Sequence, residues 1–173
     1  MSYEMRALTV WQPWASLLGT PVRWTKKGQT IYSKRYETRT WATDYRGTIA
    51  IHAAARPIHE CVRDIRLSSS DMQMLVQALL PIIQLDGSPA GIDWRDVAMD
   101  LEHYLSALPR RQIICIGELT DCVLITPEFR ARQKPRELAL GNWEIGNYAW
   151  KIDKRRPIPP VTVNGAQGLW RWR

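Results

Sequence analysis

Two short stretches of the sequence hold side chains that could bind a flat, charged ligand or act on it. WQPWASLLG, from Trp11 to Gly19, places two tryptophans around a Gln-Pro pair. YSKRYETRTW, residues 32–41, interleaves cations, a carboxylate and aromatic rings. Indole rings stack on planar ligands, but each also buries about 150–250 Å² when it packs in a core. The residue types alone therefore leave stacking and packing both open.

The second stretch has an unusual pattern if it forms one extended strand. Alternate side chains of a strand share a face, which predicts Lys34 and Tyr36 on one side and Glu37 and Arg39 on the other. A bend would instead bring Glu37 close to Lys34 or Arg46. Exposed ion pairs contribute only about 0–1 kcal/mol, so these charges favour a polar recess. A charged, solvent-exposed edge strand is the alternative.

The composition is typical of one globular domain with a basic surface. Of 173 residues, 45% are apolar and 24% are charged, and the formal net charge is +7. Residues 60–108 include eight acidic and three basic side chains, a balance of −5, so the rest of the chain carries +12. We interpret the basic part as a scaffold that faces a polyanion and the acidic part as an insertion. A solvated basic surface is the alternative.

The hydrophobic pattern predicts mostly β-structure outside the acidic segment. A short helix is expected between Pro13 and Gly19, because proline favours the start of a helix and glycine its end. Gly117 predicts a bulge within a long strand, and the basic stretch 153–160 is predicted to be a turn. Strands are expected at residues 5–10, 22–27, 31–39, 46–53, 113–125, 147–152 and 169–172.

The acidic segment is predicted to be helical. Apolar residues at helical spacing indicate one helix from the serines at 68–70 to Pro81. A second helix is expected from Asp93, as its cap, to just before Pro109, with a Gly- and Pro-rich loop at 84–93 between the two. We therefore expect an α+β fold with one domain over residues 1–173. This is a small β-barrel with a short N-terminal helix and a helical insertion at about 56–110.

Several classes of function are not supported by the sequence. It contains neither a GxxxxGK[ST] nor a GxGxxG phosphate loop. His52, His59 and Cys61 come nearest to a metal cluster, but without a CxxC pair or an HExxH helix, so we predict no metal and no cofactor. No run reaches the roughly 18–20 apolar residues that span a bilayer. Three cysteines are too few for a disulfide framework, and we expect a cytoplasmic protein with no membrane partner.

Four segments, in this order, resemble the ASCH (activating-signal-cointegrator homology) family of the PUA-like superfamily. ALTVWQPWASLL resembles the family's opening strand and turn, and KRYETR fits its KxxExR motif. YRGTIAIHAA resembles the strand that follows, and CIGELTDCV the later long strand. LGNWEIGNYAWKI and PIPPVTVNGAQGLW resemble the closing segments, so the resemblance covers most of the chain outside residues 56–110. It implies a PUA-like β-barrel, a cleft beside the first helix, and recognition of RNA or a modified nucleoside.

The resemblance also implies which residues line the cleft. They are Trp11, Gln12, Trp14, Lys34, Glu37, Arg39, Trp41, Arg46, His52 and Glu118. One tryptophan would close the fold while the other stacks on a base, and the sequence does not say which does which. The glutamine amide could meet a base edge, the cations phosphate, and Glu37 an exocyclic amine or a ribose hydroxyl. For His52 the competing interpretation is an inner histidine with satisfied hydrogen bonds.

Three functions fit these expectations. The first is a module that binds RNA or a nucleotide. The second is a hydrolase of RNA or of an N4-acylcytidine, with Lys34 and Glu37 as the acting groups. The small amidohydrolases of the superfamily have a threonine where this chain has Glu37, and they lack the helical insertion. The third is a protein-interaction module that docks through that insertion. The basic stretches 130–136 and 154–156 suggest phosphate contacts or solvated loops.

Overall fold

The structure is a computed structural model, and it describes residues 5–24, 27, 30–83 and 92–173. It is an α+β fold around a six-stranded sheet with the order β4-β7-β6-β5-β1-β8, beside a two-stranded β2-β3 hairpin. The elements are β1 (Met5–Val10), α1 (Trp14–Gly19), β2 (Pro21–Trp24), β3 (Thr30–Tyr32), β4 (Tyr36–Arg39), β5 (Gly47–Ala53), α2 (Ile58–Arg63), α3 (Ser69–Ile83), α4 (Trp94–Met99), α5 (Leu101–Leu105), β6 (Gln112–Leu124), α6 (Pro127–Ala131), α7 (Pro135–Ala139), β7 (Tyr148–Thr162) and β8 (Leu169–Trp172).

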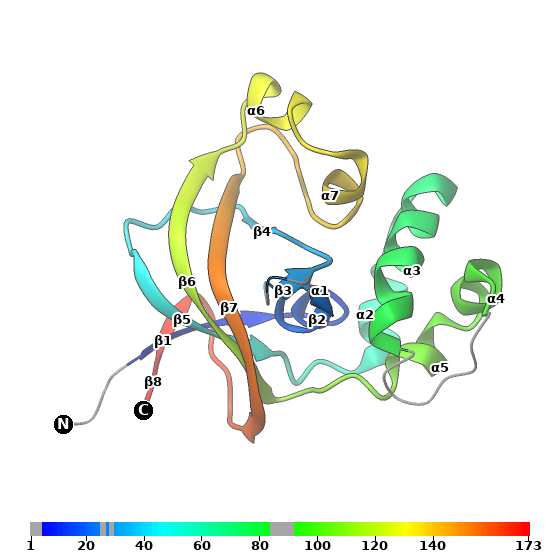
Figure 1. Cartoon of the computed structure of the whole chain (residues 1–173), viewed down its shortest axis with the longest axis horizontal. Helices are drawn as coiled ribbons and strands as arrows, with labels where there is room; N and C mark the ends of the chain where they lie inside the picture. Colours follow the sequence, from blue (N-terminus) through cyan, green and yellow to red (C-terminus); the bar gives the residue numbers. More distant parts are fainter. Residues whose placement is uncertain (1–4, 25–26, 28–29, 84–91) are drawn as a thin grey trace.

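The large sheet curves around the N-terminal part of the chain. β1 and β5 are parallel, and the other neighbouring pairs are antiparallel. Figure 1 shows the long strands β6 and β7 curving past α1, β2 and β3, which lie on their concave side. Within the described residues the edge strands β4 and β8 are not paired with each other, so the sheet is not closed. The expected small barrel is therefore not confirmed.

The long strand β6 has the bulge that the sequence predicts, whereas β7 lacks the predicted turn. The register of β6 shifts against β7 between Ile116 and Glu118, so the bulge predicted at Gly117 is confirmed. The turn predicted at 153–160 is wrong, because β7 runs through it to Thr162. Its neighbour β4 pairs only with residues 148–151. The proline-rich end of β7 therefore has a free edge, where proline is tolerated.

The strand expected at 31–39 is wrong, because it is two strands joined by a bend. β3 pairs with β2, and β4 pairs with β7. In the link between them, the Lys34 N–H donates to the carbonyl of Leu17 at 3.2 Å, which ties the link to α1. As a result Lys34 and Glu37 lie beside each other and not on opposite faces. Residues 25–26 of the strand expected at 22–27 lie outside the described residues, and β2 ends at Trp24.

Among the described residues, four helices lie between β5 and β6, to one side of the sheet in Figure 1. The predicted caps are present: Ser68 Oγ accepts from Asp71 N at 3.2 Å, and the Asp93 carboxylate accepts from Arg95 N at 2.8 Å. α3 continues two residues beyond Pro81, and the single helix expected after Asp93 is divided at Asp100 into α4 and α5. Most of the loop expected at 84–93 lies outside the described residues. The short helices α6 and α7 were not predicted.

Helix α1 lies between two hydrophobic cores and fixes the turn before it. Leu18 packs in the cluster formed with the sheet, whereas Leu17 packs in the cluster formed with α3, α4 and α5. Gly19, the last residue of α1, is so close to β6 that a Cβ there would lie 3.0 Å from Cys115 Cβ. Trp14 packs against both clusters. The aromatic turn is therefore held on two sides.

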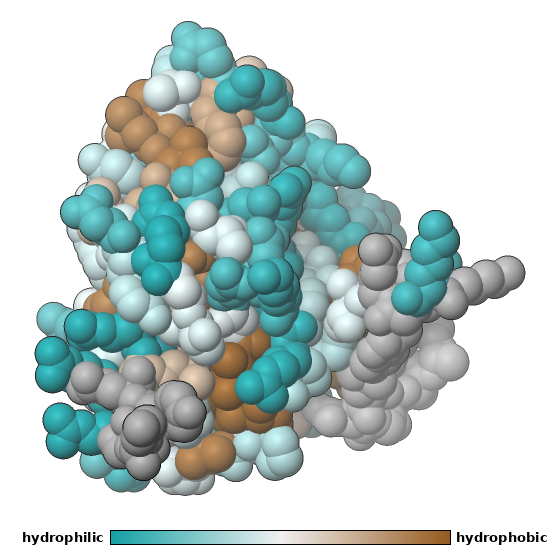
Figure 2. Space-filling model, turned by 60° about the vertical axis from the view of Figure 1, so that its left-hand side comes forward, coloured by the Kyte–Doolittle hydropathy of each residue, from teal (hydrophilic) through white to brown (hydrophobic). Residues whose placement is uncertain are grey.

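The surface of the sheet is mainly polar on the side that Figure 2 presents. Hydrophilic residues cover most of this face, and hydrophobic residues gather in separate areas near the top and the bottom of the view. Among residues 5–24, 27, 30–83 and 92–173, no helix combines the length and the apolar composition needed to cross a membrane.

Candidate functional site

A cavity of about 570 Å³ opens beside α1, and we call it the aromatic cavity. This volume is within the range of about 300–1,000 Å³ that is typical of small-molecule sites. The wall comes from the turn before α1, the link between β3 and β4, the end of α2 and the chain after α7. The lining residues are Trp11, Gln12, Trp14, Lys34, Glu37, Thr38, Cys61, Asp64, Ile65, Arg66, Leu67, Ala139, Leu140, Gly141 and Asn142.

The turn presents its two tryptophans differently. The Trp11 side chain is exposed, with 51% of its surface accessible, and the guanidinium carbon of Arg56 lies 3.9 Å from the ring centre. Trp14 is half-buried between the two cores. Both rings line the cavity. Trp11 is therefore the ring that can stack on a ligand from solvent, either on its free face or by displacing Arg56.

Gln12 holds the turn in place. Its side chain is buried, with 2% exposed, and Nε2 donates to the carbonyl of Pro109 at 2.6 Å. Its Oε1 accepts from Ser16 N at 3.1 Å, in the first turn of α1. Both ends of the amide are thus occupied by the chain itself. We interpret Gln12 as a residue that orients Trp11 and Trp14, and less as a reader of a base edge.

A chain of three charged side chains begins on the floor of the aromatic cavity with Lys34 and Glu37 and continues to Arg39, which lies outside its lining. Lys34 Nζ lies 3.2 Å from Glu37 Oε2, and Glu37 Oε1 lies 3.2 Å from Arg39 Nη2. Lys34 Nζ also donates to the carbonyl of Leu140 at 2.7 Å, and Arg39 Nη2 donates to that of Thr9 at 2.7 Å. Lys34 is 2% exposed and Glu37 is 7% exposed. Buried charges of this kind persist only where each has a partner.

Two atoms in this charge network remain without a well-directed hydrogen bond. Glu37 Oε2 and Arg39 Nε are buried, and neither has a hydrogen-bond partner among the described residues. Glu37 Oε2 is nevertheless within ion-pair distance of Lys34. Buried polar atoms are normally satisfied, and the exceptions often mark functional sites. The network therefore has spare hydrogen-bonding capacity directly under the cavity.

The helical insertion contributes a wall that the sequence analysis did not anticipate. Cys61 and Asp64, at the end of α2, line the aromatic cavity. Asp64 is hydrogen-bonded to Arg56, and this contact holds the pKa of the carboxyl below its ordinary value. Burial raises the pKa of the Cys61 thiol, so the thiol stays protonated and is a poor nucleophile. The insertion is thus part of the site, and its Asp64 also holds Arg56 in place over the Trp11 ring.

Two predicted residues line a smaller recess on the other side of Trp11. This recess of about 340 Å³ is lined in part by Arg39 and Trp41. The Trp41 ring packs edge-on against Trp150, with ring centres 4.6 Å apart. Trp11 belongs to both walls. Arg39 and Trp41 are therefore close to the aromatic cavity but separated from it by Trp11 and Glu37.

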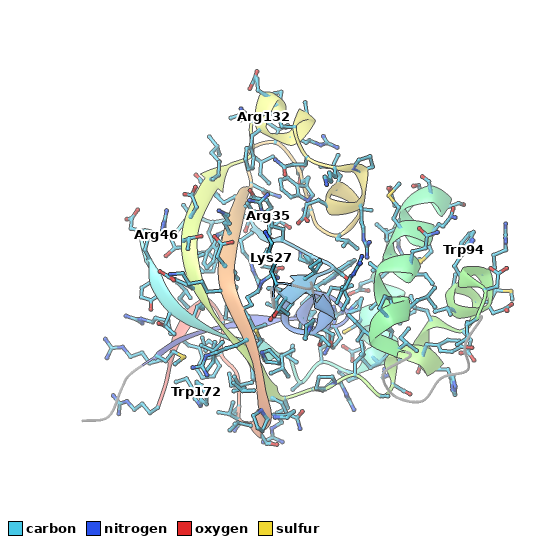
Figure 3. All side chains as sticks on the ribbon, viewed as in Figure 1. Lys27, Arg35, Arg46, Trp94, Arg132 and Trp172 are labelled. Carbon is cyan, nitrogen blue, oxygen red and sulfur yellow. The ribbon has the colours of Figure 1, made fainter. Side chains whose placement is uncertain are left out.

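Three predicted residues lie elsewhere. Arg46 pairs with Asp121 at 3.7 Å, and Figure 3 shows it on the far side of β5 and β6 from α7. Glu118 pairs with Lys154 at 2.7 Å on the long strands. His52 is 1% exposed, with Nδ1 at 3.2 Å from Thr9 Oγ1 and Nε2 at 3.0 Å from the carbonyl of Val163. Burial lowers the pKa of His52, as expected for an inner histidine.

Sequence reasoning missed the residues that close the cavity from the distant parts of the chain. Residues 64–67 follow α2, and residues 139–142 run from the last residue of α7 into the chain after it. Their types are ordinary, and the only signal was the glycine-asparagine pair at 141–142, which indicates a turn but no ligand. In the described part of the chain no group of three or more His, Cys, Asp or Glu side chains is arranged to hold a metal ion.

No protein-family model matches the chain, and no curated protein matches its sequence.

Proposed function

We propose that the protein binds RNA or a nucleotide and recognises a base or modified nucleoside in the aromatic cavity. The observation that supports this most directly is the combination of an exposed indole, Trp11, with a buried cation and carboxylate, Lys34 and Glu37, around one cavity. A heterocycle offers a flat face and polar edges, and these groups match both. The proposal includes membership of the ASCH family, with the curved sheet corresponding to its small PUA-like barrel.

The geometry of the floor favours binding over catalysis. Lys34 Nζ is held by the Leu140 carbonyl and by Glu37, and Glu37 is also paired with Arg39. A general base must reach the proton that it removes, whereas the oxygen Glu37 Oε2 is covered in this state. We therefore assign these residues a positioning role in the proposed function.

A hydrolase acting on RNA or on an N4-acylcytidine is the second candidate. The unsatisfied Glu37 Oε2 beside Lys34 favours it, because a water or hydroxyl that reaches this oxygen once ligand binding uncovers it would complete its hydrogen bonding and be activated by it. In this candidate Glu37 takes the proton and Lys34 stabilises the developing negative charge. Turnover of N4-acetylcytidine or of a short RNA, lost in Glu37→Gln with nucleoside binding retained, would establish it over the binding module.

A protein-interaction role for the helical insertion gains little support. Docking surfaces carry apolar patches. Among the described residues of the insertion, Met99 is the one large apolar side chain that is exposed. A single methionine does not make a patch.

The test of the proposed function is nucleoside binding by the full chain, measured by calorimetry or NMR with a panel of plain and modified nucleosides. Trp11→Ala is expected to weaken binding by about 1–3 kcal/mol, the contribution of stacking on one base. Trp94→Ala on α4 is the matched control, because its ring also has an arginine beside it, with Arg95 at 5.0 Å, and Figure 3 shows it far from α1. Equal losses in both variants, or no binding by the wild type, would refute the proposal.

A further inference from the structure

A second cavity, of about 350 Å³, lies against the other side of the link between β3 and β4. We call it the basic cavity. Its wall includes four cationic side chains: Arg35 from the link, Arg132 just after α6, and Lys134 and Arg136 at the start of α7. Figure 3 shows Arg35 and Arg132 on the same side of the long strands, toward α6 and α7. Cations from separate segments thus face one hollow.

The charge of the basic cavity is not balanced by the carboxylates of its own lining. Its one carboxylate, Glu137, accepts hydrogen bonds from the backbone N–H groups of Arg35 and Tyr36, at 3.1 and 2.9 Å. The four cations are exposed, and none of them forms an ion pair with a carboxylate of the described residues. Four positive charges and one negative charge leave a formal excess of +3. Such an excess attracts a polyanion.

The other basic stretch of the sequence, residues 154–156, has fewer cations available to bind phosphate. Lys154 is paired with Glu118. Arg155 is half-buried, donates to the carbonyls of Leu18 and Lys34 at 2.8 and 2.6 Å, and stacks on Tyr32 with 4.1 Å to the ring centre. These side chains are occupied by the protein itself. Of residues 154–156 only Arg156 is exposed without an ion pair among the described residues, whereas residues 130–136 hold four such cations, of which Arg136 also lies 3.4 Å from Ser33 Oγ and Arg132 lies over the Phe129 ring.

The two cavities also lie close to each other along the chain. Lys34 lines the aromatic cavity, and its neighbour Arg35 lines the basic cavity. Likewise residues 133–137 line the basic cavity and residues 139–142 line the aromatic one. α7 and the β3–β4 link therefore form a common wall. A strand with a base in the aromatic cavity would pass its backbone over this wall.

We propose that the basic cavity binds the phosphate backbone of the single-stranded RNA whose base enters the aromatic cavity. This inference rests on the proposed function and names its ligand as a strand, not a free nucleoside. Arg132, Lys134 and Arg136 supply the phosphate contacts, and the aromatic cavity supplies selection. A cluster of exposed cations binds phosphate without reading sequence.

The experiment compares two triple variants that remove the same formal charge. One is Arg132→Gln, Lys134→Gln and Arg136→Gln, in the basic cavity. The control is Arg46→Gln, Lys151→Gln and Lys154→Gln, whose cations are already ion-paired. The binding of a fluorescein-labelled single-stranded RNA of about eight nucleotides is measured against salt concentration. All six side chains are at least partly exposed, so both variants are expected to fold.

In the basic-cavity variant the slope of log K against log salt is expected to become less steep by about 2. Each phosphate contact on a single strand contributes about 0.7, and the variant removes three. The control is expected to keep nearly the wild-type slope. Equal losses in the two variants would overturn the inference, and so would a polyglutamate peptide that binds the wild type as tightly as RNA does. Nucleoside binding should be unchanged in the basic-cavity variant. Absence of nucleoside binding in the wild type, with the slope still lost in the variant, would refute the proposed function and leave the phosphate site standing.

Discussion

The two cavities on either side of the β3–β4 link differ in the balance and the burial of their charged side chains. In the aromatic cavity two positive and two negative side chains balance, and the central pair, Lys34 and Glu37, is almost fully buried. In the basic cavity the cations are exposed and outnumber the single carboxylate by three. One cavity therefore has a fixed polar floor, and the other has an exposed positive rim.

The difference follows from desolvation. Removing a charge from water costs several kcal/mol, about the amount that a partner must return, so the buried Lys34 has both a carboxylate and a carbonyl. Lys134 stays in water and needs no partner. Fixed groups can discriminate between ligands of similar shape, whereas solvated cations attract any polyanion. We infer that the aromatic cavity selects the ligand and that the neighbouring basic cavity adds affinity.

The largest expected effect tests this contrast between the two lysines. Lys34→Met should lower the free energy of unfolding by about 3 kcal/mol, because breaking a buried pair costs about 3–5 kcal/mol and Arg39 still partners Glu37. Lys134→Met should change it by less than about 0.5 kcal/mol, as for most surface substitutions. Urea unfolding of both variants gives the comparison.

A double variant separates the loss of the pair from the loss of packing. Lys34→Met combined with Glu37→Leu removes both charges, and such apolar replacements of buried pairs are often neutral. It should recover most of the stability lost in Lys34→Met, although Arg39 then keeps only its bond to the Thr9 carbonyl. Equal destabilisation by Lys34→Met and Lys134→Met would mean that the two cavities do not differ in the way described.

The next effect is on binding, and it tests whether the two cavities contribute differently to affinity and selection. With three phosphate contacts, the affinity for single-stranded RNA should fall roughly 20-fold between about 50 and about 200 mM salt. Nucleoside affinity over the same range should change by less than about twofold, because a nucleoside carries no phosphate and the central pair of the aromatic cavity, Lys34 and Glu37, is buried. Titrations of both ligands at several salt concentrations test this. A nucleoside affinity that falls as steeply as that of RNA would show that binding depends on an exposed charge of the aromatic cavity, such as Arg66, and not on its buried pair.

Much of the framework could be predicted from the sequence, because it depends on local patterns. Apolar runs and caps located β1, β5, β6 and the start of α3, and Gly117 marked the bulge. The course of β7 could not be predicted, since its prolines are tolerated only because β4 pairs with the first part of the strand and not with the proline-rich end. That fact belongs to strand pairing, which a local pattern does not contain.

The site was predictable to the extent that its residues are close in sequence. Lys34 and Glu37 are three residues apart, and a bend alone brings them together. The occupation of the Gln12 amide depends on Pro109, almost a hundred residues away. Arg35 joins the cations of α7 from a similar separation. Such long-range neighbours, and the lack of acidic partners around them, become visible only in the folded chain.

The smallest effect concerns His52, which lies outside both cavities and so serves as a reference for them. Burial lowers its pKa below the ordinary value of 6.5, so the unfolded chain binds a proton more readily than the folded one. The free energy of unfolding should therefore decrease as the pH falls below about 6.5 and reach its full value above it.

His52→Gln should reduce this acid sensitivity, as measured by urea unfolding at about pH 8 and about pH 5.5. Nucleoside binding should be equal in the variant and the wild type at both pH values, because His52 contacts Thr9 and Val163 and not the aromatic cavity. If acid weakens nucleoside binding in the wild type but not in His52→Gln, protonation of His52 acts on the aromatic cavity. The charge of that cavity would then not be fixed by Lys34 and Glu37 alone, and the contrast with the basic cavity would no longer be one between paired and unpaired groups.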